Sequence, residues 1–182
     1  LLEKKIVRAV GVSRYDVPQL EQAEKLLQLD AGQYPLNAFE RDFGMHPGVA
    51  AYRPITPVLD YCERNNIGVM AYGAVVKGLL AGRFDGTETF PEGDPRSRHK
   101  MFQGKEFKKR VEAVEEMRPI AEKHGKTLAQ LAINWTLCQP GVTSALVGAR
   151  SPAQVRDNAG ASGWRLERED LEEIERIVAH IP

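Results

Sequence analysis

Four short apolar runs along the chain are typical of buried parallel strands. They cover residues 6–12, 31–34, 67–72 and 144–147. The first reads IVRAVGV and the third reads IGVMAY, and these two are the clearest. Because they are mostly apolar or β-branched and do not alternate with polar residues, we expect strands that are covered on both faces.

Between these runs, apolar residues recur at helical spacing. The predicted helices cover residues 17–29, 56–65, 107–124, 127–138, 152–160 and 171–181. Asp16 is a predicted N-cap of the first helix, and Pro119 is expected to end or kink the third. The segments 36–54 and 82–104 show neither period. A loop as long as 82–104 is usually a functional lid or a disordered segment, so we predict a lid-like loop.

Alternation of strands and helices indicates an α/β fold with a parallel sheet and right-handed crossovers. The pattern alone leaves two architectures, a small open sheet covered on both faces or part of a barrel. A closed eight-stranded β/α barrel usually needs about 250 residues, whereas the chain has 182. We find no internal repeat and no separating linker, so we predict a single domain over residues 1–182.

The composition excludes several classes of protein. Hydrophobic residues make up 42% of the chain and charged residues 27%, as in average globular proteins. The 25 basic residues balance the 25 acidic ones, so no global charge attracts nucleic acid or an anionic membrane. No run reaches the roughly 18 uncharged apolar residues of a membrane-spanning helix. We therefore expect neither nucleic acid nor a membrane as a partner.

Cysteine and histidine give no sign of a disulfide scaffold or a metal site. Cys62 and Cys138 lie in apolar helical patterns, and the four histidines do not cluster. No Cys-x-x-Cys pair is present. The first residues also lack the charged-then-apolar pattern of a signal peptide. We therefore expect a reduced, cytoplasmic setting and no bound metal.

Ligands of parallel α/β proteins bind at the carboxyl ends of the strands. The residues at these ends are Ser13 and Arg14, Gln33 and Tyr34, Tyr72 and Gly73, and 148–150. No Gly-x-Gly-x-x-Gly follows a strand, so the fingerprint of a Rossmann dinucleotide site is absent.

The sequence GARSP, which follows the fourth strand, indicates a phosphate site. Ser151 is a predicted N-cap and Pro152 suits the first helical turn. The free amides of that helix and the charge of Arg150 together favour a phosphate. Lys77, which follows the third strand, is placed to neutralise a second phosphate. Two phosphate sites suggest a dinucleotide.

Five stretches, in this order, resemble the carboxyl half of an aldo-keto reductase. They are VRAVGVSRYDVPQL, QYPLNAFERD, IGVMAYGAVVKGLLAGRF, FPEGDPRSRHKMFQG and GKTLAQLAINWTLCQPGVTSALVGARSPAQVRDN. The resemblance implies the second half, strands five to eight, of a TIM-type (β/α)8 barrel. It also implies an oxidoreductase that reduces aldehydes or ketones with NADPH, or less often NADH, bound in an extended form.

The resemblance implies that one group of residues contacts the nicotinamide. Ser13 and Gln33 would hydrogen-bond its carboxamide, and Tyr72 would stack on the ring. Arg14 occupies a position where the family usually has Asn, and it is expected to lie beside the same carboxamide.

A second group would hold the phosphates and the adenosine. The residues expected to line the pyrophosphate are Gly73, Val75, Lys77 and Gly78. Those expected to hold the 2′-phosphate and the adenosine are Gly148, Ala149, Arg150, Gln154 and Asn158. Because Arg150 suits a 2′-phosphate, NADPH is expected rather than NADH.

The family's catalytic residues are an Asp, a Tyr, a Lys and a His on its second, third and fourth strands, which this sequence does not match. Its histidines fall in loops or at helix ends. We therefore predict no catalytic residue in this chain and no activity of the chain alone. A small carbonyl compound would be the substrate of the complete enzyme.

Two further expectations concern assembly. Four parallel strands leave two unpaired edges, which favour association. We therefore expect an oligomer or pairing with a missing half. The alternative function is a non-catalytic nucleotide-binding or regulatory subunit on the same scaffold.

Overall fold

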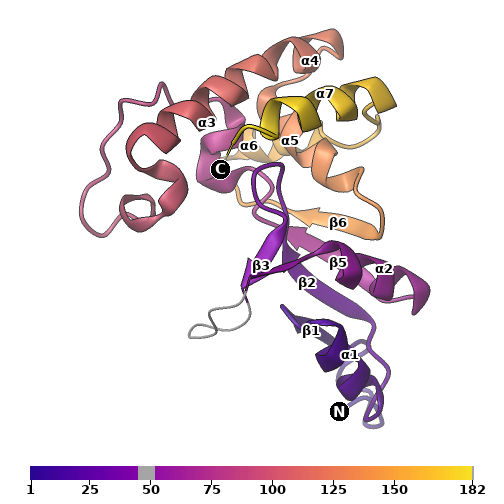
Figure 1. The fold of residues 1–182 in the computed structure, drawn as a ribbon. Coiled ribbons are helices and arrows are strands. Elements are labelled where there is room, and N and C mark those ends of the chain that lie inside the picture. Colours follow the sequence, from indigo (N-terminus) through magenta and orange to yellow (C-terminus); the bar gives the residue numbers. More distant parts are fainter. Residues whose placement is uncertain (45–51, 182) are drawn as a thin grey trace. The chain divides into compact units, whose positions relative to one another are not determined.

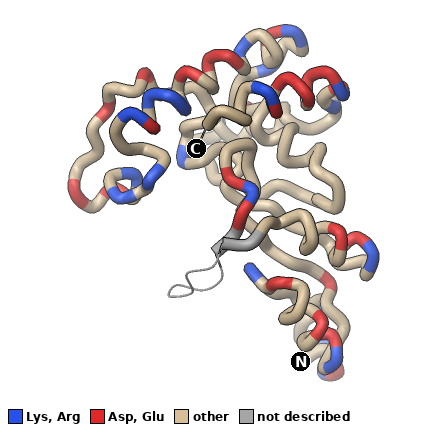
Figure 2. The backbone as a smooth tube through the Cα atoms, viewed as in Figure 1, with Lys and Arg blue, Asp and Glu red and all other residues tan. Residues whose placement is uncertain are grey.

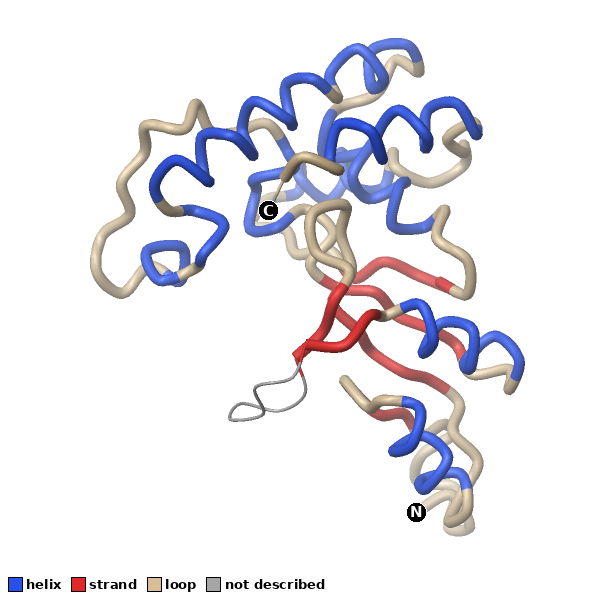
Figure 3. The backbone as a smooth tube through the Cα atoms, viewed as in Figure 1, coloured by secondary structure: helices blue, strands red, loops and turns tan. Residues whose placement is uncertain are grey.

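The structure is a computed structural model that describes residues 1–44 and 52–181. The chain forms two compact units. The first comprises Leu1–Gly73 and Thr136–Leu146, and the second comprises Ala74–Trp135 and Val147–Pro182. All four strands of the parallel sheet belong to the first unit, whereas the regular elements of the second are helices (Figure 3).

The first unit is built on a four-stranded parallel sheet with the order β1-β2-β5-β6 (Figure 1). Its strands are Gly11–Ser13 (β1), Ala31–Pro35 (β2), Gly68–Tyr72 (β5) and Val142–Leu146 (β6). The register aligns Ser13 with Gln33 and Pro35 with Tyr72, so the carboxyl ends of these strands lie together. The predicted α/β class with a parallel sheet is confirmed.

The strand predicted over 6–12 is shorter and shifted. Only Gly11–Ser13 pairs with β2, and Ile6 is 66% exposed. Asp30 explains where the pairing stops, because its carboxylate accepts the Val10 amide at 2.7 Å and its own amide donates to the Val10 carbonyl at 2.8 Å. The residues before Val10 therefore have no ladder partner in β2.

Two helices of the first unit follow their predicted starts. In α1 (Val17–Glu24), Asp16 accepts the Gln19 amide and Gln19 accepts the Asp16 amide, each at 3.0 Å, in a capping box. The helix ends five residues before the predicted Leu29, and Leu26 is 85% exposed. Helix α2 (Thr56–Arg64) buries its predicted inward residues, which are Val58, Leu59 and Cys62.

The segment 36–54 was predicted as a loop, and it contains two short strands. Asp42–Gly44 (β3) pairs antiparallel with Tyr52–Pro54 (β4). Sequence pattern missed them because three-residue strands are too short to show a period. His46 lies outside the described residues.

The second unit consists of packed helices. They are α3 (Gly104–Glu116), α4 (Arg118–Lys123), most of α5 (Leu128–Leu137), α6 (Pro152–Ala159) and α7 (Arg168–Val178). Pro119 lies in the first turn of α4, because a proline without an amide hydrogen cannot continue α3. The predicted break is therefore confirmed. The apolar faces bury Val114, Leu131, Trp135 and Ile174.

The segment 82–104 is more structured than its polar sequence predicted. It contains two 3-10 helices, η2 (Pro95–Arg98) and η3 (Lys100–Phe102). Four phenylalanines pack around them with ring centroids 5.5 to 6.0 Å apart, edge-on in five of the six pairs, namely Phe84, Phe90, Phe102 and Phe107. The segment and Phe107 of α3 therefore form a small aromatic core.

Charged residues occur in both units and are frequent in α3 and α7 (Figure 2). Within residues 1–44 and 52–181, no helix combines the length and the apolarity that a membrane span requires.

Candidate functional site

At the carboxyl end of β1 in the first unit, the Gln33 carbonyl accepts two hydrogen bonds. The Ser13 hydroxyl donates to it at 3.2 Å and the Arg14 amide donates to it at 3.0 Å. The structure therefore brings together the three residues that the sequence predicted for the carboxamide of a nicotinamide. Their positions depend on the main chain of β2.

Arg14 has a left-handed backbone with φ of 60°. This conformation is uncommon for a residue with a side chain. The Nε atom of Arg14 is buried, and neither it nor the rest of the guanidinium has a hydrogen-bond or ion-pair partner among the residues that the structure describes.

Tyr72 and Gly73 end β5 in the same unit. The Tyr72 carbonyl accepts the Leu36 amide at 3.0 Å, and the Tyr72 side chain is half-buried. Gly73 has φ of 81°, and a Cβ atom added there would have no neighbour within 4 Å. The glycine is therefore required by its backbone conformation, and the space above it is open to a ligand.

In the second unit, the chain after β5 turns sharply through three left-handed residues. These are Val76 with φ of 44°, Lys77 with 51° and Gly78 with 98°. The turn is closed by a hydrogen bond of 2.9 Å from the Gly78 amide to the Val75 carbonyl. Left-handed backbone at a β-branched residue such as Val76 is unfavourable and tends to occur at ligand sites. The Lys77 side chain is exposed.

The loop 148–150 is held by side chains of α6 in the same unit. The Arg150 amide donates to Gln154 Oε1 at 2.6 Å, and Asn158 Nδ2 donates to the Gly148 carbonyl at 3.4 Å. Ser151 caps the helix, because its Oγ accepts the Gln154 amide at 3.2 Å. The Arg150 side chain is exposed, and Arg150 directly precedes this N-cap in the sequence. The arrangement suits an anion.

Asp94 lies within electrostatic reach of this loop, which the sequence did not indicate. Its carboxylate binds Arg96 with contacts of 2.5 to 3.2 Å, and Arg96 stacks on Phe90 at 4.5 Å. Hydrogen bonds from Arg96 lower the pKa of the Asp94 carboxyl to about 2, and the charge of Arg150 acts in the same direction.

Comparison with known proteins decides the family. The profile of the Aldo/keto reductase family matches residues 3–179. The chain belongs to this family. An aldo-keto reductase of Bacillus subtilis, YhdN, is 34% identical over 173 residues, which cover 94% of the chain and 49% of YhdN. The aldo-keto reductase yakc [NADP(+)] of Schizosaccharomyces pombe is 27% identical and covers 92% of the chain and 47% of its own length.

A solved structure shows the fold. The glycerol dehydrogenase AKR11B4 from Gluconobacter oxydans superposes with a TM-score of 0.87 at 36% identity, over 98% of the chain and 51% of that structure. The chain therefore has a partial TIM-barrel fold of the aldo-keto reductases, a family of oxidoreductases. It spans about half the length of the relatives that it matches.

Two tyrosines of this aldo-keto reductase chain have raised pKa values. Burial raises the pKa of Tyr34, whose hydroxyl donates to the Tyr15 carbonyl at 2.9 Å. A hydrogen bond to Glu24, with a smaller effect of burial, raises the pKa of Tyr61 to about 12. Among the described residues, no group of three or more His, Cys, Asp or Glu is placed to hold a metal.

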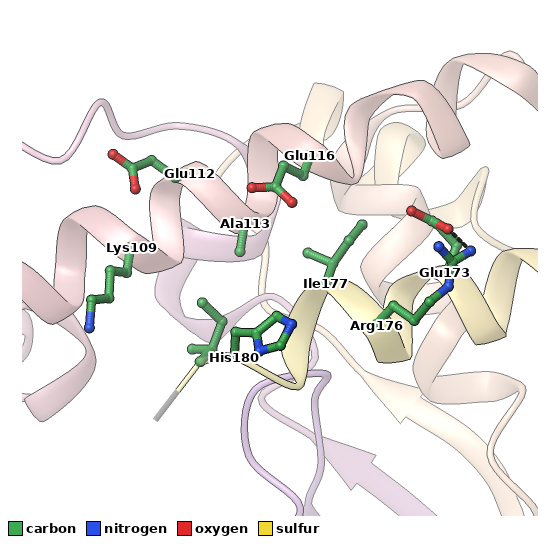
Figure 4. A pocket seen from close by; sticks show the side chains of 9 residues that line it. Lys109, Glu112, Ala113, Glu116, Glu173, Arg176, Ile177 and His180 are labelled. Carbon is green, nitrogen blue, oxygen red and sulfur yellow. Dashed lines mark ion pairs between the residues drawn. The ribbon is translucent and has the colours of Figure 1, made fainter.

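A surface pocket of about 410 Å³ lies between α3 and α7 (Figure 4). Ala113, Ile177 and Ile181 form its apolar floor, and charged side chains such as Lys109 and Glu116 surround it. None of the predicted cofactor residues lines it. The pocket is therefore separate from the candidate site.

Proposed function

We propose that this chain is the carboxyl half of an aldo-keto reductase, with its four parallel strands as strands five to eight of the barrel. The chain would bind NADPH and so supply the cofactor part of a reductase for aldehydes or ketones. The observation that carries the proposal is the loop 148–150, which Gln154 and Asn158 hold in place and which presents Arg150 beside a capped helix terminus.

The residues of each unit suit one end of the cofactor. In the first unit, Ser13 and Gln33 are register partners at the ends of β1 and β2, and their side chains would bind the carboxamide. Tyr72 would offer an aromatic face to the nicotinamide ring. The open space above Gly73 admits a ligand close to the backbone.

In the second unit, the cofactor's phosphates would bind at the turn around Lys77 and at the loop 148–150. Lys77 would supply a positive charge from a left-handed turn, and Gly148 leaves room because a Cβ atom there would meet nothing within 4 Å. Arg150 would bind the 2′-phosphate through a charge-assisted contact, which favours NADPH. Adenosine would lie beside Gln154 and Asn158.

When bound, NADPH supplies a hydride. The chain's own residues would hold the nicotinamide and cover one of its faces. We propose that the proton donor of the reaction is not among these 182 residues, so that the chain alone binds NADPH without reducing a carbonyl. Among residues 1–44 and 52–181, no strand pairs with the outer edge of β1 or β6, and these edges would pair with further strands or with a second chain.

The test compares Arg150→Glu with Arg156→Glu, which places the same charge at an exposed site on α6. Arg150→Glu should weaken NADPH binding by about tenfold or more, and NADH binding much less, because only NADPH carries the 2′-phosphate. Arg156→Glu should change both affinities little. Titration calorimetry gives all the dissociation constants.

Equal losses of NADPH and NADH affinity in Arg150→Glu would overturn the assignment of Arg150. The absence of any NADPH binding by the unaltered chain would overturn the proposed function as a whole.

A further inference from the structure

Arg14 combines a left-handed backbone with a buried side-chain donor that has no partner among the described residues. Its backbone is left-handed, with φ of 60°, although the residue carries a long side chain. The hydrogen bond of 3.0 Å from its amide to the Gln33 carbonyl fixes it in this conformation at the carboxyl end of β1. Strained residues of this kind cluster at ligand sites.

The guanidinium of Arg14 can donate to an acceptor that no residue in 1–44 or 52–181 provides. An arginine has five N–H donors and accepts no hydrogen bonds. The Nε atom of Arg14 is withdrawn from water, yet no described residue accepts a hydrogen bond from the side chain or forms an ion pair with it. A buried donor without a partner is unfavourable, and a ligand that accepts from it removes the cost.

The position of Arg14 restricts which ligand its side chain can bind. Arg14 follows Ser13 directly and lies beside Gln33, at the strand ends where ligands of this fold bind. Under the proposed function, the phosphates of the cofactor belong to residues of the second unit. The charge of Arg14 is therefore left for the second ligand of the reaction.

We propose that Arg14 binds a carboxylate on the carbonyl substrate, so that the substrate class is carbonyl compounds that carry an acid group. A carboxylate only accepts hydrogen bonds and can take two parallel N–H donors from one guanidinium. A neutral carbonyl or amide oxygen would leave the charge of Arg14 unpaired. This inference rests on the proposed function.

The experiment measures the preference for a carboxylate in the 182-residue chain saturated with NADP⁺. Pyruvate and pyruvamide share a skeleton and differ in the charge of one group, so the ratio of their dissociation constants isolates that charge. The unaltered chain should bind pyruvate about tenfold more tightly than pyruvamide. Arg14→Gln should reduce the ratio to about one.

Two further variants keep the result interpretable. Arg14→Gly removes the guanidinium and suits the left-handed backbone, so it should fold and should also lose the preference. Arg8→Gln removes an exposed arginine from the segment before β1 and should keep the preference.

The outcomes separate the two proposals. Titration with NADP⁺, followed by tryptophan fluorescence, tests the proposed function by itself, and a chain that does not bind NADP⁺ overturns both. A chain that binds NADP⁺ but shows the same pyruvate preference before and after Arg14→Gly overturns the role of Arg14 alone.

Discussion

The two units hold their candidate ligand residues in different ways. In the first unit, main-chain atoms of the sheet determine the positions, as the Gln33 carbonyl does for Ser13 and Arg14. In the second unit, side chains of α6 determine the position of the loop 148–150 through Gln154 and Asn158. A change to the first arrangement should therefore lower the stability of the fold. A change to the second should alter ligand binding and leave the stability of the fold unchanged.

The largest effect is expected from Gly11→Ala in the first unit. A Cβ atom at Gly11 would lie 2.7 Å from the Ala31 carbonyl oxygen, so β1 and β2 must separate. We expect the free energy of unfolding to fall by about 2 kcal/mol. Gly68→Ala is the matched control in β5, because its nearest atoms would lie at 3.5 and 3.6 Å.

Urea unfolding followed by circular dichroism measures both variants, and Gly68→Ala should change the free energy by less than about 0.5 kcal/mol. Equal losses in the two variants would mean that the close approach of β1 to β2 is not what determines stability at this strand end.

A smaller effect, on binding alone, is expected from Gln154→Ala in the second unit. The change removes the acceptor of the Arg150 amide, so the loop 148–150 loses one of its two tethers. We expect the affinity for NADPH to fall about fivefold, which corresponds to a hydrogen bond of about 1 kcal/mol. The free energy of unfolding should hardly change.

Val155→Ala serves as its control, because Val155 is 57% exposed on the same helix. A loss of stability in Gln154→Ala as large as its loss of affinity would contradict the contrast between the units.

Local chemistry was predictable from the sequence. Asp16, and Ser151 before Pro152, carry the signals of helix starts, and the structure places Asp16 and Ser151 as N-caps. Pro119 broke the third helix for an equally local reason.

Features that depend on distant partners were not predictable. The length of β1 depends on Asp30, nineteen positions after Gly11, and the packing in 82–104 depends on phenylalanines from several turns. Gln154 and Asn158 were expected to reach an adenosine, and in the structure both bind the loop backbone. Their contact with adenosine stays a prediction, since no pattern shows which partner a polar side chain finds.

The central claim is the proposal that this chain binds NADPH, and amide hydrogen exchange with and without NADPH tests it most directly. The account predicts slower exchange in segment 11–14 of the first unit and in segment 148–154 of the second, at NADPH concentrations that saturate binding. Unchanged exchange in either segment at saturating NADPH would contradict it.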